Sequence, residues 1–510
     1  LNENTAGARD VASEETIAVY GGLNFKPSKT PQLEANVRVY RSEDSDGQFA
    51  GQLFDSTFNN SVPAGGTACP EVIRSFFCGT ASTRDDVDIA TSVREGDIVS
   101  PFFGGVAAAW DFKAGLDREI TRLTGDITYD FSDRVSVTYQ GGLTTEDNQT
   151  VTNQSYSPTV VGNSFGSFPS AWVTDDISDR TYWSHEARIN WEITDQIDFL
   201  AGVFAYDEET SGVDRNIIEA AYGFDGERSN EEKAAFAGLD FQVTDALSFG
   251  LEGRVYEEDV SVLTAVNNAR GSELSTSFDG FTWRATADYQ FENDMLLYGS
   301  VSTGNKAGGF NTKVNPDDPD EAPLSSFDEE LATQYEIGLK GQLFDNRLRF
   351  SGAAYRIELT DQQLSQVVVL REGTPEQVQV TVVLNAGETE INGFELDGQF
   401  DVTDNLTLAA AWATSDSEIT EGEDPSIAAT FGSTSIVGKT VPRVSKDSGT
   451  ISAQLRLPEL GTWEPNLRVD GIYASSRFAS ISNLTETGES FKTNARLSFT
   501  SEEYGTDLTI

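Results

Sequence analysis

A two-residue alternation of apolar and polar side chains constrains what this chain can fold into more than any other feature of its sequence. In the segment before Asp133, Leu123, Ile127 and Phe131 belong to the apolar set, and Thr128 belongs to the polar set between them. Successive side chains of a β-strand point to opposite faces of the sheet, so the pattern predicts a strand with one apolar face. The alternation continues for about ten positions, which exceeds the usual five or six residues of a strand.

The same pattern recurs along the chain, each time around a short turn that contains Asp. The side chains of Asp, Asn and Thr favour tight turns because they can hydrogen-bond to nearby backbone groups. The turn residues are Asp133, Asp195, Asp245, Asp294, Asp345 and Asp404. Each repeat therefore predicts a hairpin of two long strands joined by a short turn.

An aromatic residue lies shortly before each of these turns. The residues are Phe131, Trp191, Phe241, Phe291, Phe344 and Phe400, and Trp183, Phe281 and Trp283 are candidates for a second band at the other end of the strands. Strands that can cross a membrane with about 9–11 residues, aromatic bands and alternating short and long connections are typical of outer-membrane β-barrels. The sequence therefore predicts a transmembrane barrel in preference to a sandwich, with the Asp-containing turns on the periplasmic rim.

Composition and charge exclude two other classes of protein. The chain has 45 Gly, 31 Phe and 15 Tyr against one Met and one His, which favours β-structure with many turns. It contains no apolar run of the roughly 20 residues that a membrane-spanning helix needs. Its 35 Lys and Arg residues against 83 Asp and Glu give a formal net charge of −48. Nucleic-acid binding needs clustered Lys and Arg, so no nucleic-acid partner is expected.

The predicted fold class is all-β, an antiparallel transmembrane β-barrel of the outer-membrane type that takes up residues 1–510. The alternating stretches indicate about 17 or 18 strands, compared with about 22 in barrels with a plugged lumen. They begin near 16–25 and 33–41 and finish near 492–500 and 506–510.

Cys69 and Cys78 are the only cysteines, and both lie in a segment, 42–109, that is predicted to be a long extracellular loop. A metal site would normally use four ligands, so a disulfide in an oxidising compartment is the favoured interpretation, with two free thiols as the alternative. The same loop contains several Phe residues. These could contact an apolar ligand, but a small core internal to the loop is the favoured interpretation.

Other candidate sites have little support in the sequence. His185, the only histidine, shares the apolar face with Trp183, and packing at the membrane interface is its expected role. The acidic clusters 43–46 and 317–321 lack the spacing of a calcium loop, so solvated loop charge is expected there. No nucleophile and base can be assembled without a second His or a Gly-x-Ser-x-Gly motif, so no enzyme activity is expected. No cofactor is expected either.

The stretch 295–311, MLLYGSVSTGNKAGGFN, resembles a signature of the barrel in TonB-dependent outer-membrane receptors. The segments 329–363, 384–400 and 441–449 resemble further parts of that family in the same order. The motif positions, which we expect to be structural, are Tyr298, Gly304, Lys306, Gly308, Gly309, Phe310, Asn311, Tyr335, Glu336, Gly338, Asn385, Gly387, Gly393 and Glu395. The stretch lacks the Gly-Lys-Ser/Thr order of a phosphate-binding loop. It is therefore expected to be the top of a strand that bends into an external loop.

This resemblance implies uptake of a bulky, scarce nutrient across a bacterial outer membrane, with a ferric siderophore as the default cargo and cobalamin, haem and oligosaccharides as the other candidates. It also implies two further partners, the lipid of the outer membrane and TonB, which acts through a plug domain. No plug domain is recognisable in this sequence. A passive porin and a secreted acidic β-rich adhesin are the alternatives.

Because the chain also lacks recognisable opening and closing strands of the family, it is expected to be an incomplete copy of a longer receptor. The sheet should then be open, with a gap between 16–25 and 506–510. A hydrogen-bond ladder between those two segments would favour the porin.

The cysteine pair gives a first testable prediction. Alkylation of the native protein without reductant, followed by mass spectrometry, should detect no free thiol. Reduction should release both thiols and remove about 2–3 kcal/mol of stabilisation from the loop, as expected for a short-range staple. Two alkylated cysteines in unreduced material would contradict the pairing.

Overall fold

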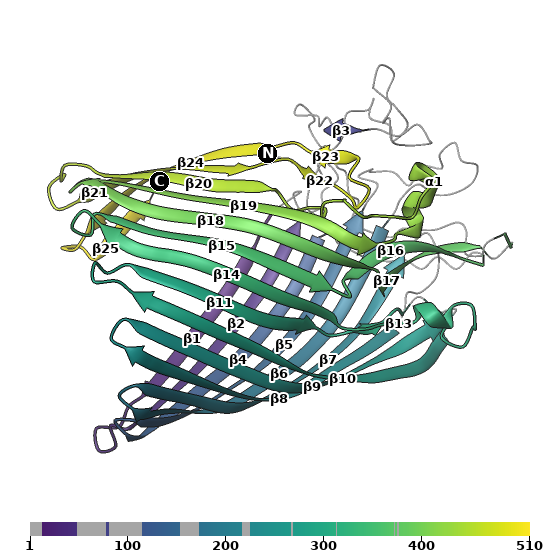
Figure 1. The fold of residues 1–510 in the computed structure, drawn as a ribbon, viewed down its shortest axis with the longest axis horizontal. Helices are drawn as coiled ribbons and strands as arrows, with labels where there is room; N and C mark the ends of the chain where they lie inside the picture. The colour runs from purple at the N-terminus through teal and green to yellow at the C-terminus, as the bar shows by residue number, and fades with distance from the viewer. Residues whose placement is uncertain are drawn as a thin grey trace.

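A computed structural model describes residues 13–47, 78–80, 115–153, 173–216, 225–266, 269–312, 314–371, 373–374 and 377–509. Most of these residues form one 18-stranded antiparallel sheet that curls around a hollow, as Figure 1 shows. Each strand pairs with the sheet strands that precede and follow it in the chain, so the sheet is a continuous meander. The fold class and strand number predicted from the sequence are confirmed.

The sheet strands in chain order are β1 (Thr16–Phe25), β2 (Leu33–Gly47), β4 (Gly115–Ser132), β5 (Val135–Asn153), β6 (Val173–Thr194), β7 (Ile197–Asn216), β8 (Asp225–Thr244), β9 (Leu247–Val266), β10 (Ala269–Gln290), β11 (Leu296–Lys306), β14 (Glu330–Leu343), β15 (Leu348–Thr360), β18 (Gly387–Thr403), β19 (Leu406–Gly422), β20 (Asp447–Arg456), β21 (Glu464–Ala474), β24 (Ser490–Ser501) and β25 (Thr506–Thr509).

The connections contribute the remaining short elements. These are β3 (Gly79–Thr80), β12 (Gly309–Phe310), β13 (Ser326–Phe327), β16 (Gln363–Leu370), β17 (Val378–Asn385), β22 (Arg477–Phe478), β23 (Thr485–Thr487), the 3₁₀ turns η1 (Ala322–Leu324) and η2 (Pro425–Ile427), and the single-turn helix α1 (Ala428–Phe431). Within the described ranges, no helix is long and apolar enough to cross a membrane.

The six Asp-containing turns all lie on one rim of the sheet, here called the turn rim. They join β4 to β5, β6 to β7, β8 to β9, β10 to β11, β14 to β15 and β18 to β19. Because consecutive strands are antiparallel, hairpins that alternate in this way must turn at the same edge. The connections between these hairpins lie on the opposite rim, here called the loop rim. The predicted placement of all six Asp-containing turns on one rim is confirmed, but the β9–β10 connection on the loop rim is short rather than long.

The strands β4 to β10 run farther toward the loop rim than the sequence indicates. The alternation of short and long connections predicts a long connection over 261–277, between the hairpins of Asp245 and Asp294, but β9 and β10 fill all of it except 267–268. In this part of β9, Glu257, Asp259 and Ser261 continue the face that is apolar at Leu251 and Val255, so the apolar face is lost while the backbone ladder continues. Ser229 and Ser261, for example, face each other across β8 and β9 with their hydroxyl oxygens 2.7 Å apart.

The two faces of the sheet differ in chemistry as predicted. Apolar side chains on the outer face remain uncovered, with Ile127 48% and Ile337 57% exposed. On the inner face, Thr128 lies with its hydroxyl oxygen 3.1 Å from that of Thr138 on the next strand. Buried apolar clusters occur instead among the loop-rim connections, where Val382 and Ile436 are fully buried. An exposed apolar band around an ordered sheet indicates that lipid, not protein, covers the outer face.

The sheet has two unpaired edges, β1 and β25. Among the described residues, no ladder joins these strands, which confirms the expected open sheet. One contact bridges the two ends of the sheet at the loop rim. There Gly79 and Thr80 of β3, in the β2–β4 connection, pair in parallel with Thr485 and Glu486 of β23, in the β21–β24 connection.

The two faces give a second prediction. Ile127→Arg on the outer face should lower the free energy of unfolding in lipid vesicles by about 2–4 kcal/mol, since a charge at the bilayer midplane is poorly solvated. Thr128→Arg, one residue away on the inner face, should cost much less. Denaturant titration in vesicles measures both variants, and equal losses would mean that neither face contacts lipid.

Candidate functional site

The inner wall of the sheet carries charged side chains that pair across neighbouring strands. Arg118 on β4 lies 2.9 Å from Asp44 on β2, and Arg284 on β10 lies 2.6 Å from Glu252 on β9. Arg254 on β9 similarly pairs with Glu232 on β8. The pairing neutralises the wall locally while leaving donors and acceptors directed into the hollow.

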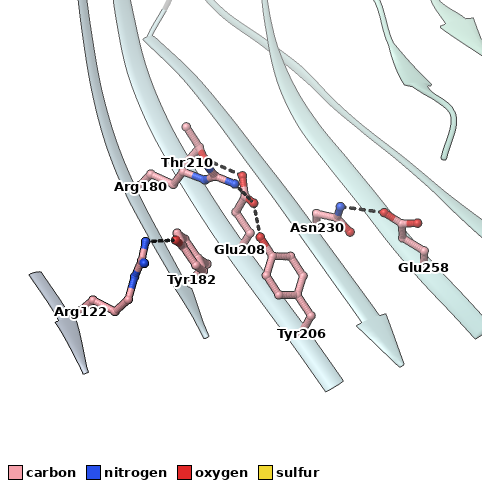
Figure 2. Close-up of polar contacts among 8 residues, drawn as sticks. All are labelled: Arg122, Arg180, Tyr182, Tyr206, Glu208, Thr210, Asn230 and Glu258. Atoms are coloured by element: carbon pink, nitrogen blue, oxygen red, sulfur yellow. Dashed lines mark hydrogen bonds and ion pairs between the residues drawn. The ribbon is translucent and has the colours of Figure 1, made fainter. Parts of the chain in front are cut away.

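A polar cluster occupies the inner wall on the loop-rim side of Trp183 (Figure 2). Arg180 Nη2 on β6 lies 2.6 Å from Glu208 Oε2 on β7, and the Tyr206 hydroxyl donates to the same carboxylate. Thr210 donates to the other carboxylate oxygen at 3.3 Å. Burial acts to raise the pKa of the Glu208 carboxyl, but the hydrogen bonds from Arg180 and Tyr206 outweigh it, and the pKa is lowered.

Two neighbouring groups extend this cluster along the wall. Arg122 Nη2 on β4 donates to the Tyr182 hydroxyl at 3.4 Å, and Asn230 Nδ2 on β8 donates to Glu258 Oε1 at 2.7 Å. Burial, reinforced by nearby carboxylates, raises the pKa of Glu258. Within the described part of the chain, Arg180 Nε and Asn230 Oδ1 are buried without a hydrogen-bond partner. Because both atoms are buried, they are not accessible to a molecule in the hollow.

A second hollow of about 800 Å³ lies on the inner wall nearer the turn rim. Its lining combines cationic side chains, Lys340, Arg349 and Arg468, with the carboxylates Asp397 and Asp470. Mixed charge of this kind suits a polar protein surface better than a single ion. Among the described residues, no group of three or more His, Cys, Asp or Glu could hold a metal.

Amide side chains join the connections at the loop rim. Asn311, after β12, donates to the carbonyl oxygens of Leu324 and Val383 at 2.8 Å and accepts from the Val383 N–H at 2.8 Å. Asn385, at the end of β17, accepts from the Asp328 N–H at 2.6 Å and donates to the Asp361 carbonyl at 2.8 Å. The side chains of both motif asparagines therefore hold separate loop-rim connections together by hydrogen bonds.

Motif glycines on the inner wall make room for tyrosine rings. A Cβ on Gly338 would lie 2.4 Å from the ring of Tyr298, and a Cβ on Gly393 would lie 2.1 Å from the ring of Tyr355. Tyr298 donates from its hydroxyl to Glu336 Oε1 at 2.7 Å. Each ring therefore lies flat over the neighbouring backbone and holds two strands in register.

The remaining motif residues have positional roles. Gly308 is enclosed, since a Cβ there would lie 2.3 Å from the Phe327 carbonyl oxygen and 2.5 Å from the Phe278 ring. The others lie at the end of β11 (Gly304, Lys306), in the β12–β13 pair (Gly309, Phe310), on the outer face (Tyr335), and on β18 (Gly387, Glu395). The stretch 302–311 is the end of a strand that continues into a loop, as predicted.

Sequence reasoning missed Gln363, whose side chain joins three segments. Its Nε2 donates to the carbonyl oxygens of Ala307 and Asp328 at 2.8 and 3.1 Å, and its backbone N–H donates to Glu330. Gln363 is the last residue of the segment 329–363 that resembles the receptor family. Its position at the start of a strand, directly after a turn, was the only sign in the sequence that its side chain could link segments. Long-range contacts of this kind depend on which loops meet, and that information is absent from local sequence.

The acidic clusters are not simply solvated loop charge, so that expectation was wrong for two residues. Asp44 is buried in β2, where it accepts from Thr16 and Arg118. Glu321 is 2% exposed and pairs with Arg371 at 2.6 Å. Each carboxylate is thus held by a charge-assisted hydrogen bond that compensates for its burial.

His185 lies on the outer face of the sheet. Its ring centroid is 5.0 Å from that of Trp183, and its Nδ1 lies 2.7 Å from the Tyr139 hydroxyl. Packing at the aromatic band is confirmed.

Cys78 is disulfide-bonded. Its predicted partner Cys69 lies outside the described residues, as do the loop Phe residues, so the pairing stays a prediction.

An antiparallel meander with tight turns on one rim, an apolar outer face and a polar, ion-paired inner face defines the wall of an outer-membrane-type β-barrel. The family model described as TonB dependent receptor-like, beta-barrel, matches residues 79–510. The chain therefore belongs to the TonB-dependent receptor family, which is a family of transport receptors and not of enzymes.

Individual relatives agree with this assignment. A probable TonB-dependent siderophore receptor, PiuA, from Acinetobacter baumannii is 24% identical over 240 residues, which is 46% of this chain and 30% of that protein. The ferric yersiniabactin uptake receptor FyuA from Yersinia pestis has the same fold with a TM-score of 0.69 at 14% identity, covering 98% of this chain and 66% of that one. The PiuA crystal structure gives a TM-score of 0.68 at 16% identity, covering 97% and 69%. The chain thus spans less than a third of the curated relative.

The ring-over-glycine contact gives a third prediction. Gly338→Ala should lower the free energy of unfolding by about 1–3 kcal/mol, because the new Cβ overlaps the Tyr298 ring. Gly299→Ala is the matched control on the neighbouring strand, since its Cβ would lie no closer than 3.7 Å to the Glu336 carbonyl oxygen. Thermal unfolding in detergent measures both, and equal stability of the two variants would refute the contact's importance.

Proposed function

We propose that this chain is the barrel wall of a bacterial outer-membrane receptor that takes up a ferric siderophore with energy from the TonB system. The observation that carries the proposal is the family match over 79–510 on a sheet with a lipid-compatible outer face and a polar inner wall. The names of the relatives support this cargo class, because the similar proteins include siderophore receptors. The enzyme class has no support from the described residues.

The partners follow from the two faces of the wall. The apolar outer face would contact the lipid of the outer membrane, with the turn rim toward the periplasm. The mixed-charge inner wall near Lys340 and Arg468 would contact a plug domain, through which TonB acts, that is not recognisable in this sequence. The segment predicted as 42–109 would contribute an extracellular loop that is stapled by Cys69 and Cys78, although its first residues, 42–47, form the end of β2.

The alternatives have less support. The passive porin has less support, because the family model that matches residues 79–510 is that of TonB dependent receptors. A secreted adhesin would have a water-exposed outer face, whereas Leu251 and Val255 leave large apolar surfaces uncovered there. Both observations favour the gated receptor.

Uptake of iron gives the fourth prediction. Deleting the gene that encodes this chain should abolish growth on a cognate ferric siderophore under iron limitation and the uptake of ⁵⁵Fe-siderophore. Inactivating the TonB system should do the same, because passive diffusion is too slow for a bulky cargo. Uptake that persists without TonB would support the porin.

A charge reversal tests whether uptake depends on the inner wall and not on the turn rim. Arg254→Glu places two carboxylates together on the inner wall and should reduce uptake by about tenfold, the effect of losing about 1.4 kcal/mol of interaction. Arg134→Glu is the control, since Arg134 pairs with Asp195 at the exposed turn rim. Immunoblots of outer membranes correct for the amount of each variant. Equal uptake by both variants would argue against a functional inner wall.

A further inference from the structure

A groove of about 670 Å³ crosses the apolar outer face of the sheet between β15 and β24. The cross-strand register shows how it forms. The row of residues that runs across neighbouring strands contains Phe350, Gly398, Ala410, Ile451 and Gly471. Gly398, Ala410 and Gly471 have no side chain beyond Cβ, so the row makes a floor that is low at these three positions, and Ile451, 61% exposed, rises between Ala410 and Gly471.

Larger side chains in the two adjacent rows form the walls of this groove. The wall on the turn-rim side consists of Leu348, Phe400 and Leu408, and the wall on the loop-rim side consists of Leu396, Trp412, Tyr473 and Phe491. The rings of Trp412 and Tyr473 stack with centroids 5.9 Å apart and an interplanar angle of 9°. The groove is therefore formed by the register of the strands and by the packing of the aromatic rings.

Charges of opposite sign lie beside the two walls. At the turn-rim wall, the exposed Arg347 guanidinium lies 5.6 Å from the centroid of the Phe400 ring, and its Nε donates to the Asp401 carbonyl at 2.8 Å. At the loop-rim wall, the Tyr473 hydroxyl donates to Glu489 at 3.1 Å. An anionic group is therefore attracted to the first wall and repelled from the second.

The dimensions of the groove suit one hydrocarbon chain in one leaflet. The floor crosses four strand spacings from β15 to β21, about 19 Å at about 4.8 Å each. Because such strands tilt by about 35–45°, a row perpendicular to them descends roughly 11–13 Å through the membrane. One leaflet of a hydrocarbon core about 30 Å thick is about 15 Å deep.

We propose that this groove binds a glycerophospholipid from the leaflet at the turn rim, with one acyl chain along the floor and the phosphate beside Arg347. The inference rests on the membrane position in the proposed function, because the groove is continuous with the lipid-facing surface. A chain in the groove gains dispersion contacts from the floor and both walls.

Native mass spectrometry of the receptor, purified in a mild detergent and supplied with 1-palmitoyl-2-oleoyl-phosphatidylethanolamine, tests the site. The wild-type protein should retain one phospholipid. Ala410→Leu fills the floor with an apolar side chain that lipid still tolerates, and it should reduce retention by about tenfold. Ala235→Leu is the matched control, because Ala235 is an exposed outer-face alanine on β8, and it should retain the lipid as the wild type does.

Two further measurements keep the test decisive. A phospholipid with brominated acyl chains should quench Trp412 fluorescence in vesicles, measured as the difference from Trp412→Phe, and Ala410→Leu should reduce that quenching. Arg347→Gln should weaken retention, and unchanged retention would overturn the assigned position of the phosphate. Equal retention by Ala410→Leu and Ala235→Leu, with both variants folded by heat-shift electrophoresis, would overturn the groove as a binding site.

The outcome is separable from that of the proposed function. Siderophore uptake is measured in cells on the same variants, and lipid retention is measured on purified protein. A receptor that retains the lipid but transports no siderophore refutes the cargo and leaves the groove standing. A receptor that transports a siderophore but loses no lipid on Ala410→Leu refutes the groove alone.

Discussion

Backbone hydrogen bonding without water is the constraint on which the rest of this structure depends. A peptide N–H or C=O left unpaired in hydrocarbon costs several kcal/mol, so a sheet that crosses a membrane must pair every strand along its length. The meander from β1 to β25 satisfies that condition at all of its interior strands. Its consequence for side chains is equally strict, since each strand must offer alternate residues to lipid and to the hollow.

The inner wall reconciles polarity with packing in two ways. Its charges are paired across strands, as in the contact between Arg284 and Glu252, which limits the cost of holding them in a partly enclosed space. Its glycines accept tyrosine rings from the adjacent strand, as Gly338 does for Tyr298. Both kinds of contact lock the register between neighbours, and the same register produces the row of small residues on the outer face.

Local sequence predicted most of the sheet because alternation and turn chemistry are local properties. The first strand, β1, has the bounds Thr16–Phe25 that the pattern indicates, and all six Asp turns lie on one rim. The prediction was wrong where polar residues take the outer-face positions, as Glu257 and Asp259 do on β9, and the loop-rim part of β9 and β10 was therefore expected to be a loop. The contact of Arg180 with Glu208 depends on the register between two strands, and that of Gln363 with Ala307 depends on which connections lie next to each other. Neither can be read from a single segment of sequence.

The parallel pairing of β3 with β23 has a mechanical consequence for the open side of the sheet. It joins a connection near one edge to a connection near the other at the loop rim. Among the described residues, no ladder joins β1 to β25 along their length. The position of one edge strand relative to the other is therefore constrained through the loop-rim connections and not through pairing of the two strands.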